Sequence, residues 1–141
     1  SWHTVLSKRD AYRRAFANFE IAKVARLSDT KLEKLLLDPG LIRNRLKIYA
    51  VRKNAQAALA AIDAFGSLDA FLWSFVNGKP IRNAWTKKTE VPAKTAASEK
   101  MSRALQKNGF TFVGPTICYA FMQATGMVND HLRDCFRYRQ V

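Results

Sequence analysis

The sequence predicts an all-α fold, on two observations. Apolar residues recur at three- and four-residue spacing in several segments, and no segment alternates convincingly at period two. Ser, Asp, Pro and Gly residues stand where such helices would begin and end. The length of 141 residues suits one domain, and a hydrophobic fraction of 48% is enough for a core. We therefore expect a single helical domain over residues 1–141.

The N-terminal part of the chain carries four helical patterns. The first follows Ser7, which opens a capping-box pattern. Residues 20–27 predict a short second helix, and Ser28 caps a third helix that Pro39-Gly40 ends. Residues 41–65 carry the longest pattern, with small and branched apolar residues along one stripe.

The rest of the chain alternates helices with one long loop. Gly66 ends the long helix and Ser67 caps the next one. Residues 77–97 show neither the helical nor the strand period of apolar residues, which predicts a loop. Residues 116–124 are apolar nearly all round, which predicts a buried central helix that contains Phe121. Further helices are predicted at residues 98–106 and, capped by Asn129-Asp130, through Cys135 and Phe136.

Charge indicates the class of partner. The chain has 24 Lys and Arg against 11 Asp and Glu, a net charge of +13, and residues 1–54 alone hold 13 basic and 5 acidic residues. A polyanion is therefore the first partner to expect, with an anionic membrane surface second. No apolar run approaches the roughly 20 residues that span a bilayer. Two cysteines cannot build a disulfide framework, which favours a reducing, cytoplasmic location.

A glycine-flanked corner within residues 105–119 is the most informative motif. Gly109 and Gly114 would allow a tight backbone between two helices, while Phe110 and Val113 pack into the angle. Free backbone amides at the start of the second helix, near Thr116, suit a phosphate. The structural alternative is an ordinary αα-hairpin with a hydrophobic clasp.

Residues 113–118, Val-Gly-Pro-Thr-Ile-Cys, resemble the helix-hairpin-helix element of DNA repair glycosylases, here over about residues 98–126. The wider sequence is similar to the DNA-3-methyladenine glycosylase I family from Ser1 to about Cys135. The similar blocks are residues 1–6, 18–20, 38–45, 71–77, 109–119 and 127–131. The resemblance implies a monofunctional enzyme that hydrolyses the N-glycosidic bond of 3-methyladenine in alkylated double-stranded DNA. We also expect the protein to be a monomer.

The resemblance also assigns DNA-contacting residues. It places the corner on DNA through Gly109, Phe110, Thr111, Val113, Gly114 and Thr116. Arg43 and Arg45 follow the Pro39-Gly40 turn and are expected to meet phosphates, the alternative being solvated charge.

A zinc site is implied in part. His131 and Cys135 are four residues apart, so one helical turn would place them on the same face. Spacing alone favours the other reading, a surface His beside a buried Cys. The family uses a His and a Cys at these positions for structural zinc and takes its other two ligands from an N-terminal segment. Neither His3 nor Cys118 matches those ligands, so the chain offers half of the site.

The same segment matters for catalysis. The chain opens at Ser1 without an initiator Met, so we expect a fragment or a processed chain. In the family the acidic residue that contacts the damaged base lies upstream of this block, which leaves no catalytic residue to assign here. Trp2 matches a pocket aromatic that would hold a cationic methylated purine, the alternative being a core or frayed-end tryptophan.

Two departures from related glycosylases refine the expected chemistry. Bifunctional relatives carry a nucleophilic Lys near the start of the second hairpin helix, whereas residues 115–117 are Pro-Thr-Ile, so no lyase step is expected. Where superfamily members place a catalytic Asp, this chain has Asn129, and we expect the neighbouring Asp130 to cap a helix.

Two other function classes remain open from the sequence. A non-catalytic module could use the same hairpin for sequence-independent DNA contact. A membrane-surface protein is disfavoured because the Lys and Arg residues are scattered and do not face a single apolar stripe.

Overall fold

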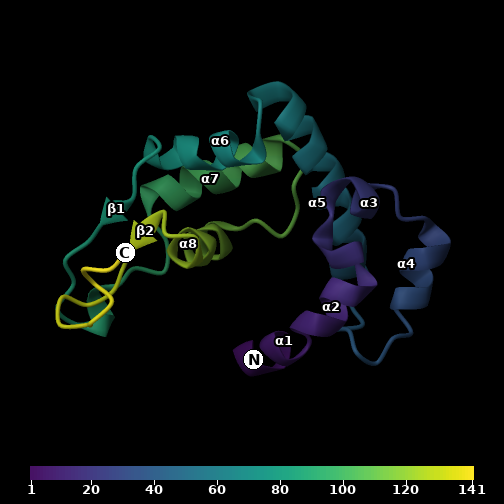
Figure 1. The fold of residues 1–141 in the computed structure, drawn as a ribbon, viewed down its shortest axis with the longest axis horizontal. Helices are drawn as coiled ribbons and strands as arrows, with labels where there is room; N and C mark the ends of the chain where they lie inside the picture. Colours follow the sequence, from purple (N-terminus) through teal and green to yellow (C-terminus); the bar gives the residue numbers. More distant parts are fainter. The chain divides into compact units, whose positions relative to one another are not determined.

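Helices dominate the computed structural model, which describes Ser1 and residues 3–141 (Figure 1). The N-terminal elements are α1 (Trp2–Ser7), α2 (Arg9–Ala15), the 3-10 helix η1 (Ala17–Phe19), α3 (Ile21–Ala25), α4 (Asp29–Leu35) and α5 (Arg45–Phe65). They are followed by α6 (Leu68–Trp73), η2 (Ser74–Val76), β1 (Ile81–Arg82), η3 (Lys88–Glu90), α7 (Ala96–Lys107), α8 (Pro115–Ala124) and β2 (Val128–Asn129). The all-α prediction is confirmed, with two very short strands added.

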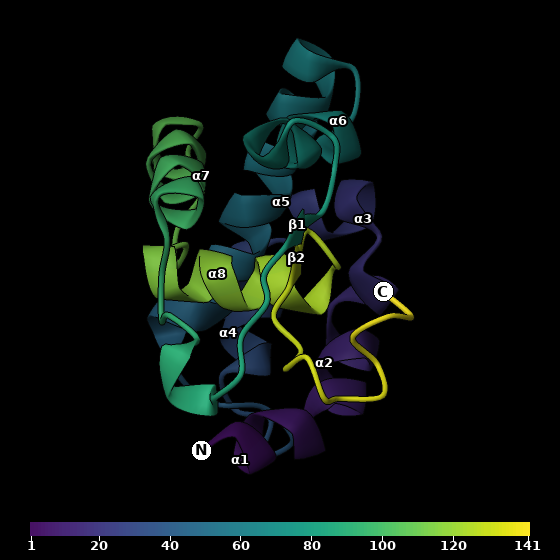
Figure 2. The ribbon, with the colours of Figure 1, turned by 90° about the vertical axis from the view of Figure 1, so that its left-hand side faces the viewer.

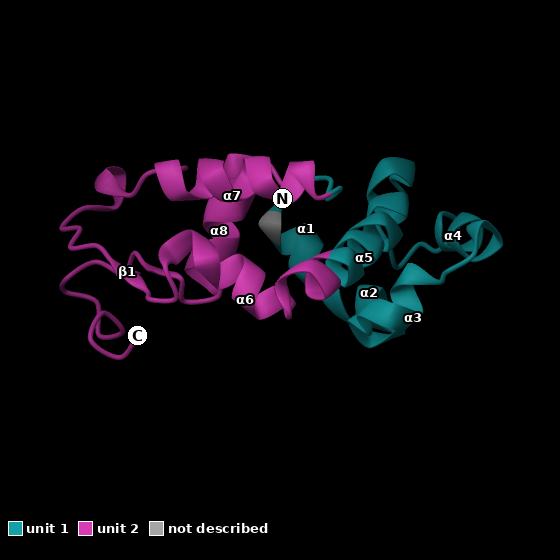
Figure 3. Cartoon of the chain, turned by 90° about the horizontal axis from the view of Figure 1, so that it is seen from above, with its two compact units in different colours: residues 1–60, 109–112 teal, residues 61–108, 113–141 magenta. Residues whose placement is uncertain are grey.

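The chain divides into two compact units (Figure 3). Unit 1 holds residues 1–60 together with the short segment 109–112, and unit 2 holds residues 61–108 and 113–141. The long helix α5 contributes to both. Segment 109–112 therefore belongs to unit 1, although the helices on either side of it in sequence belong to unit 2. The single domain over residues 1–141 stays a prediction.

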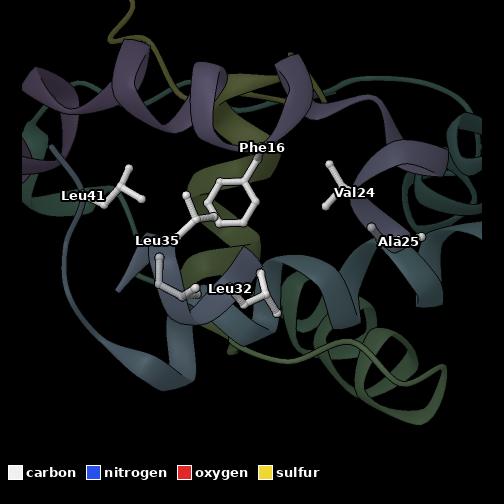
Figure 4. Packing of buried hydrophobic residues seen from close by; sticks show 8 residues of the cluster. Phe16, Val24, Ala25, Leu32, Leu35 and Leu41 are labelled. Atoms are coloured by element: carbon white, nitrogen blue, oxygen red, sulfur yellow. The ribbon is translucent and has the colours of Figure 1, made fainter. Parts of the chain in front are cut away.

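The core of unit 1 lies between α2, α3, α4 and α5. Phe16, Leu32 and Ile48 are fully buried there, and Figure 4 shows the Phe16 ring between Leu35 and Val24. Removing such side chains from water contributes roughly 1.5–3 kcal/mol each. This core holds the first turns of α5 in place, and those turns carry the basic residues discussed below.

The start of unit 1 departs from the sequence prediction. Ser7 does not cap α2; it is the last residue of α1, and its hydroxyl donates to the Thr4 carbonyl at 2.9 Å. Ser1 caps α1 through its hydroxyl. The first helix also ends early, because residues 17–19 all have positive φ values of 50–59°.

The long helix begins four residues later than predicted. The side chain of Asn44 accepts the amide of Lys47 at 3.0 Å, which is the hydrogen bond of a helix N-cap. Gly66, with φ of +85°, ends the helix as predicted. No single described helix has the length and apolar character to cross a membrane. The pair Arg45–Phe65 and Leu68–Val76 meets that test only when counted together across an 83° bend.

Within unit 2, α7 and α8 pack against each other at a steep angle (Figures 1 and 2). Ser67 caps α6 as predicted, but α7 is capped by Thr95 instead of Ser98. The prediction that residues 116–124 are buried all round is wrong. Only one side of α8 is covered by its neighbours, so Met122 is buried whereas Phe121 is 39% exposed.

Two strands join the long loop to the segment after α8. β1 and β2 pair in parallel, with Ile81 opposite Val128, and lie beside α8 (Figure 2). The rest of the predicted loop is irregular apart from η3 as far as Thr95, whereas its last two residues, 96 and 97, already belong to α7. The predicted helix through Cys135 and Phe136 is replaced by turns, because Asn129 belongs to a strand and does not cap a helix.

Candidate functional site

A bidentate hydrogen bond fixes segment 109–112 to the helix α5 of unit 1. The Asn54 side chain accepts the Thr111 amide at 2.8 Å and donates to the Thr111 carbonyl at 3.0 Å. The Thr111 hydroxyl also lies 3.3 Å from the Asn54 oxygen. One amide side chain thus satisfies both backbone groups of a residue that has no secondary structure around it. We call this pairing the Asn54 clamp.

Residues on either side of Thr111 have unusual backbone conformations. Gly109 has φ of +88°, and a Cβ atom there would lie 3.8 Å from the Cβ of Ala57, an ordinary contact. The backbone conformation, and not lack of space, therefore requires glycine at this position. Phe110 is half-buried, whereas Phe112 has φ of +58° and is 53% exposed.

The start of α8 in unit 2 has backbone amides for which the described part of the chain offers no hydrogen-bond acceptor. Gly114 is the N-cap and has no side chain to cap the helix, and Pro115 has no N–H. The first helical bond runs from the Cys118 amide to the Gly114 carbonyl at 2.9 Å. The amides of Thr116 and Ile117 in the first turn therefore have no acceptor within the helix. Such a terminus attracts anions through its N–H groups and the helix dipole.

Gly114 itself has φ of −62° and ψ of 159°, which any residue adopts. A Cβ atom there would meet nothing within 4 Å. The prediction that Gly114 is needed for a tight backbone is thus wrong for the protein by itself. A requirement for glycine at this position would have to come from a ligand that approaches the amides closely.

The Val113 carbonyl anchors the start of α8 to α7. It accepts the Ser102 hydroxyl at 2.6 Å and the Cys118 thiol at 3.3 Å. Ser102 and Cys118 are both buried, and burial raises the pKa of the Cys118 thiol. Cys118 is therefore a neutral packing residue in this corner, which agrees with its exclusion as a zinc ligand.

Of the two arginines predicted to meet phosphates, Arg45 is the first residue of α5 and Arg43 lies two residues before it. Arg43 is exposed and makes no ion pair within the described residues. Arg45 forms a bidentate pair with Glu33 at 2.5 and 2.7 Å, and its guanidinium lies 5.5 Å from the centre of the Tyr49 ring. The hydroxyl of Tyr49 also donates to Glu33. That hydrogen bond and the Arg45 pair lower the pKa of Glu33. Any phosphate that binds Arg45 must compete with this carboxylate.

His131 and Cys135 come together in unit 2 without the predicted helical turn. The Cys135 sulfur lies 3.6 Å from the His131 Nδ1 atom, in a turn closed by the Cys135 amide on the Leu132 carbonyl. Tetrahedral zinc with ordinary Zn–S and Zn–N distances separates two such ligands by about 3.5 Å. The pair therefore fits zinc as two ligands. The described residues contain no group of three or more His, Cys, Asp and Glu that could hold a metal ion.

Asn129 and Asp130 organise the segment after β2 and do not cap a helix. The buried Asn129 donates to the carbonyls of Tyr138 and Val141, both at 3.0 Å, and accepts the His131 amide at 3.1 Å. It thereby positions the residue that begins the His–Cys pair. The prediction that Asp130 is a helix cap is wrong, because its carboxylate is fully used by side chains from other elements.

Four side-chain donors converge on the Asp130 carboxylate. Asn83 and Trp85 each donate to one oxygen at 2.7 Å, while Tyr119 and Gln123 donate to the other at 2.6 and 2.8 Å. Burial alone raises the pKa of Asp130, but the four hydrogen bonds outweigh it, so the net pKa is lowered. The pKa of Tyr119 is raised by burial and by its bond to this carboxylate. Asp130 thus joins the long loop to α8.

The predicted site residues fall into three groups. Gly109, Phe110 and Thr111 lie together on segment 109–112, whereas Val113, Gly114 and Thr116 form the start of α8. His131 and Cys135 meet in the C-terminal turns. The Trp2 prediction lies outside the described residues. Sequence reasoning did not single out Asn54 or Phe112; an Asn inside a helix gives no local sign of a partner 57 residues away.

Comparisons with known proteins agree on one family. Residues 1–138 match the sequence pattern of the methyladenine glycosylase family. The chain is 47% identical to a DNA-3-methyladenine glycosylase of Haemophilus influenzae, over 96% of this chain and 73% of that protein. It is also 47% identical to DNA-3-methyladenine glycosylase 1 of Escherichia coli, over 98% of this chain and 74% of the relative.

Solved structures give the same result for the fold. A crystal structure of 3-methyladenine DNA glycosylase I superposes with a TM-score of 0.91 at 46% identity, over 96% of this chain and 75% of that one. The Staphylococcus aureus enzyme, solved to explain its recognition of 3-methyladenine, gives a TM-score of 0.93 at 35% identity, over 96% of this chain and 72% of that one.

The Asp130 network predicts a pH-dependent contribution to stability. Replacing Asp130 by Asn leaves donors without a full set of acceptors, so the free energy of unfolding should fall by about 1–3 kcal/mol at pH 7. Because the folded pKa is lowered, the carboxylate stabilises above its unfolded pKa of about 3.9, and this is lost as pH falls through the folded value. Urea unfolding from pH 7 to pH 3 should show the gap between wild type and Asp130→Asn narrowing below pH 4.

The exposed Asp134 supplies the matched control for this series. Asp134→Asn should change the free energy of unfolding by less than about 0.5 kcal/mol at every pH. A gap for Asp130→Asn that stayed constant from pH 7 to pH 3 would contradict the role given to the carboxylate.

Proposed function

The chain belongs to the methyladenine glycosylase family, and from this premise we propose that it removes 3-methyladenine from alkylated double-stranded DNA by hydrolysing the N-glycosidic bond. The observation that carries the proposal is the match over residues 1–138. The basic character of the chain, with a net charge of +13, suits a DNA substrate. A monomeric state and a cytoplasmic location stay predictions.

The start of α8 is the proposed grip on the DNA backbone. The amides of Thr116 and Ile117 and the open space around Gly114 would receive one phosphate without reading sequence. A contact of this kind suits an enzyme that must find a lesion in any sequence, because phosphate contacts position the protein and base contacts specify the site.

The damaged base is proposed to leave the duplex and to be held by aromatic side chains, with Trp2 as the candidate in this chain. A methylated purine carries positive charge, so stacking and cation–π attraction act together on it. Alkylation already weakens the glycosidic bond, because the base then leaves as a neutral molecule. Positioning the base and water can therefore supply much of the rate enhancement.

Hydrolysis is proposed to stop at the abasic site. A lyase step needs an amine nucleophile near the start of the second hairpin helix, and residues 115–117 are Pro-Thr-Ile. Release of free base should thus leave the DNA strand unbroken until alkali is added.

The function is tested by measuring 3-methyladenine released from methylated DNA, together with strand breakage, for the protein carrying the family's N-terminal residues. Wild type should release 3-methyladenine and leave intact strands. Gly114→Ala should fold as wild type, because its Cβ meets no protein atom, yet bind DNA about 10-fold more weakly if a phosphate approaches the amides.

Each result has a distinct meaning for this experiment. DNA binding by wild type without any base release would favour a non-catalytic DNA-binding module over the enzyme. A folded Gly114→Ala variant with unchanged DNA affinity would contradict the proposed phosphate contact at the start of α8. Thermal unfolding of both proteins shows whether the variant is folded.

We also propose that His131 and Cys135 supply two of the four ligands of a structural zinc ion. The support is the 3.6 Å separation of Nδ1 and Sγ, which fits adjacent ligands of one tetrahedron. The Asn129 side chain, through its bond to the His131 amide, would hold the pair in place. When bound, zinc supplies folding free energy by joining its ligands.

Zinc content by elemental analysis tests this assignment in the protein carrying the family's N-terminal residues. Wild type and Cys118→Ala should each hold about one zinc per molecule, because Cys118 points to the Val113 carbonyl. Cys135→Ala and His131→Ala should lose most of it. Full zinc content in Cys135→Ala, or none in wild type, would contradict the proposal.

A further inference from the structure

A groove of about 410 Å³ lies within unit 1, between α5 and segment 109–112. The side chains that the argument uses are Arg45, Leu46, Tyr49, Lys53, Thr111 and Phe112. We call it the α5 groove. Leu46 is 72% exposed and Phe112 is 53% exposed, so two large apolar side chains face water on its walls.

The backbone holds Phe112 in this exposed position against its own preferences. A residue other than glycine in the left-handed region costs about 1–2 kcal/mol, and Phe112 has φ of +58°. The neighbouring Asn54 clamp binds both the amide and the carbonyl of Thr111. These bonds restrict the backbone conformations that segment 109–112 can adopt. Strained backbone of this kind persists where the surroundings over-determine it, commonly at ligand-binding positions.

The charges along the groove select the occupant. Arg45 and Lys53 are eight residues apart on α5, which is about 12 Å along a helix and spans three to four nucleotides of a DNA strand. None of the described residues that line the groove is acidic. Glu33 pairs with Arg45 at one end, so Lys53 is the cation left available for a phosphate.

We propose that the α5 groove binds one strand of the DNA substrate, with Phe112 stacked on an unpaired base and Lys53 on a phosphate. An exposed aromatic ring beside a cationic helix face is the arrangement that proteins use to hold unstacked nucleotides. The choice of substrate DNA as the occupant rests on the proposed function, because base extrusion at the lesion leaves an unpaired partner base. Phe112 is then a DNA-positioning residue.

Fluorescence anisotropy with a duplex that carries a stable abasic-site analogue opposite 2-aminopurine tests the proposal. Phe112→Asn keeps a residue that tolerates positive φ and removes the ring. It should weaken DNA binding about 5- to 100-fold without altering the salt dependence of binding. It should also abolish the quenching of 2-aminopurine emission that stacking of the wild-type ring on this base would cause. Lys53→Gln should instead weaken binding and reduce the salt slope by about one.

Two further variants keep the test independent of folding. Phe112→Trp retains a stacking ring, so it should bind as wild type and its added indole emission should be quenched by DNA. Leu37→Ala is the matched control, since Leu37 is 77% exposed and does not line the groove, and it should bind as wild type. Wild-type affinity and quenching in Phe112→Asn, or unquenched emission in Phe112→Trp, would overturn the proposal.

Base release by wild type, measured in parallel, separates this inference from the function on which it rests. If wild type releases 3-methyladenine while Phe112→Asn binds DNA and excises the base equally well, the proposal that the α5 groove binds DNA is wrong and the proposed function stands. If wild type releases nothing while Phe112→Asn loses DNA affinity, the groove stands as a DNA site and the proposed function fails.

Discussion

The Asn54 clamp is the interaction on which the position of segment 109–112 in unit 1 depends. Segment 109–112 has no helix or strand to satisfy its backbone, and a loop of this kind would ordinarily sample many conformations. The Asn54 side chain meets both polar groups of Thr111, at 2.8 and 3.0 Å, from the middle of a 21-residue helix. The core around Phe16, Leu32 and Ile48 in turn holds that helix. A loop is thus given the rigidity of the scaffold.

Each unit has a position that departs from local conformational preference. Phe112 is exposed in a left-handed conformation, and the first turn of α8 has no side-chain cap. Each choice costs stability in the free protein, and each leaves a group available for a ligand. Proteins usually depart from local preference at functional positions. In contrast, the hydrogen bond from the buried Ser102 hydroxyl to the Val113 carbonyl stabilises unit 2, because it joins α7 to the residue just before the N-cap of α8.

Much of the fold could be predicted from local signals, and the failures have physical causes. Ser28, Ser67 and Gly66 lie at helix ends as predicted, because capping involves only a few adjacent residues. The prediction that Ser7 caps the first helix was wrong because Ser7 is itself the last residue of α1. The prediction that Phe121 is buried was wrong because periodicity shows which residues are apolar, and not how much of a helix the neighbouring elements cover.

The site was predictable where chemistry depends on short spacing. His131 and Cys135 meet even though the predicted helix is absent, because a tight turn also brings residues four apart together. Asp130 was misread because its four donors come from Asn83, Trp85, Tyr119 and Gln123, which lie up to 47 residues away. Asn54 and its partner 57 residues away were missed for the same reason.

The affinity of Asn54→Ala for duplex DNA with an abasic-site analogue tests this account most directly. Gln56→Ala is the control, because it removes a comparable bond, 3.1 Å to the Ala25 carbonyl, from the same helix without touching segment 109–112. We predict that Asn54→Ala stays folded and loses at least about 10-fold in affinity, while Gln56→Ala binds as wild type. Equal, wild-type affinity in both folded variants would contradict the account.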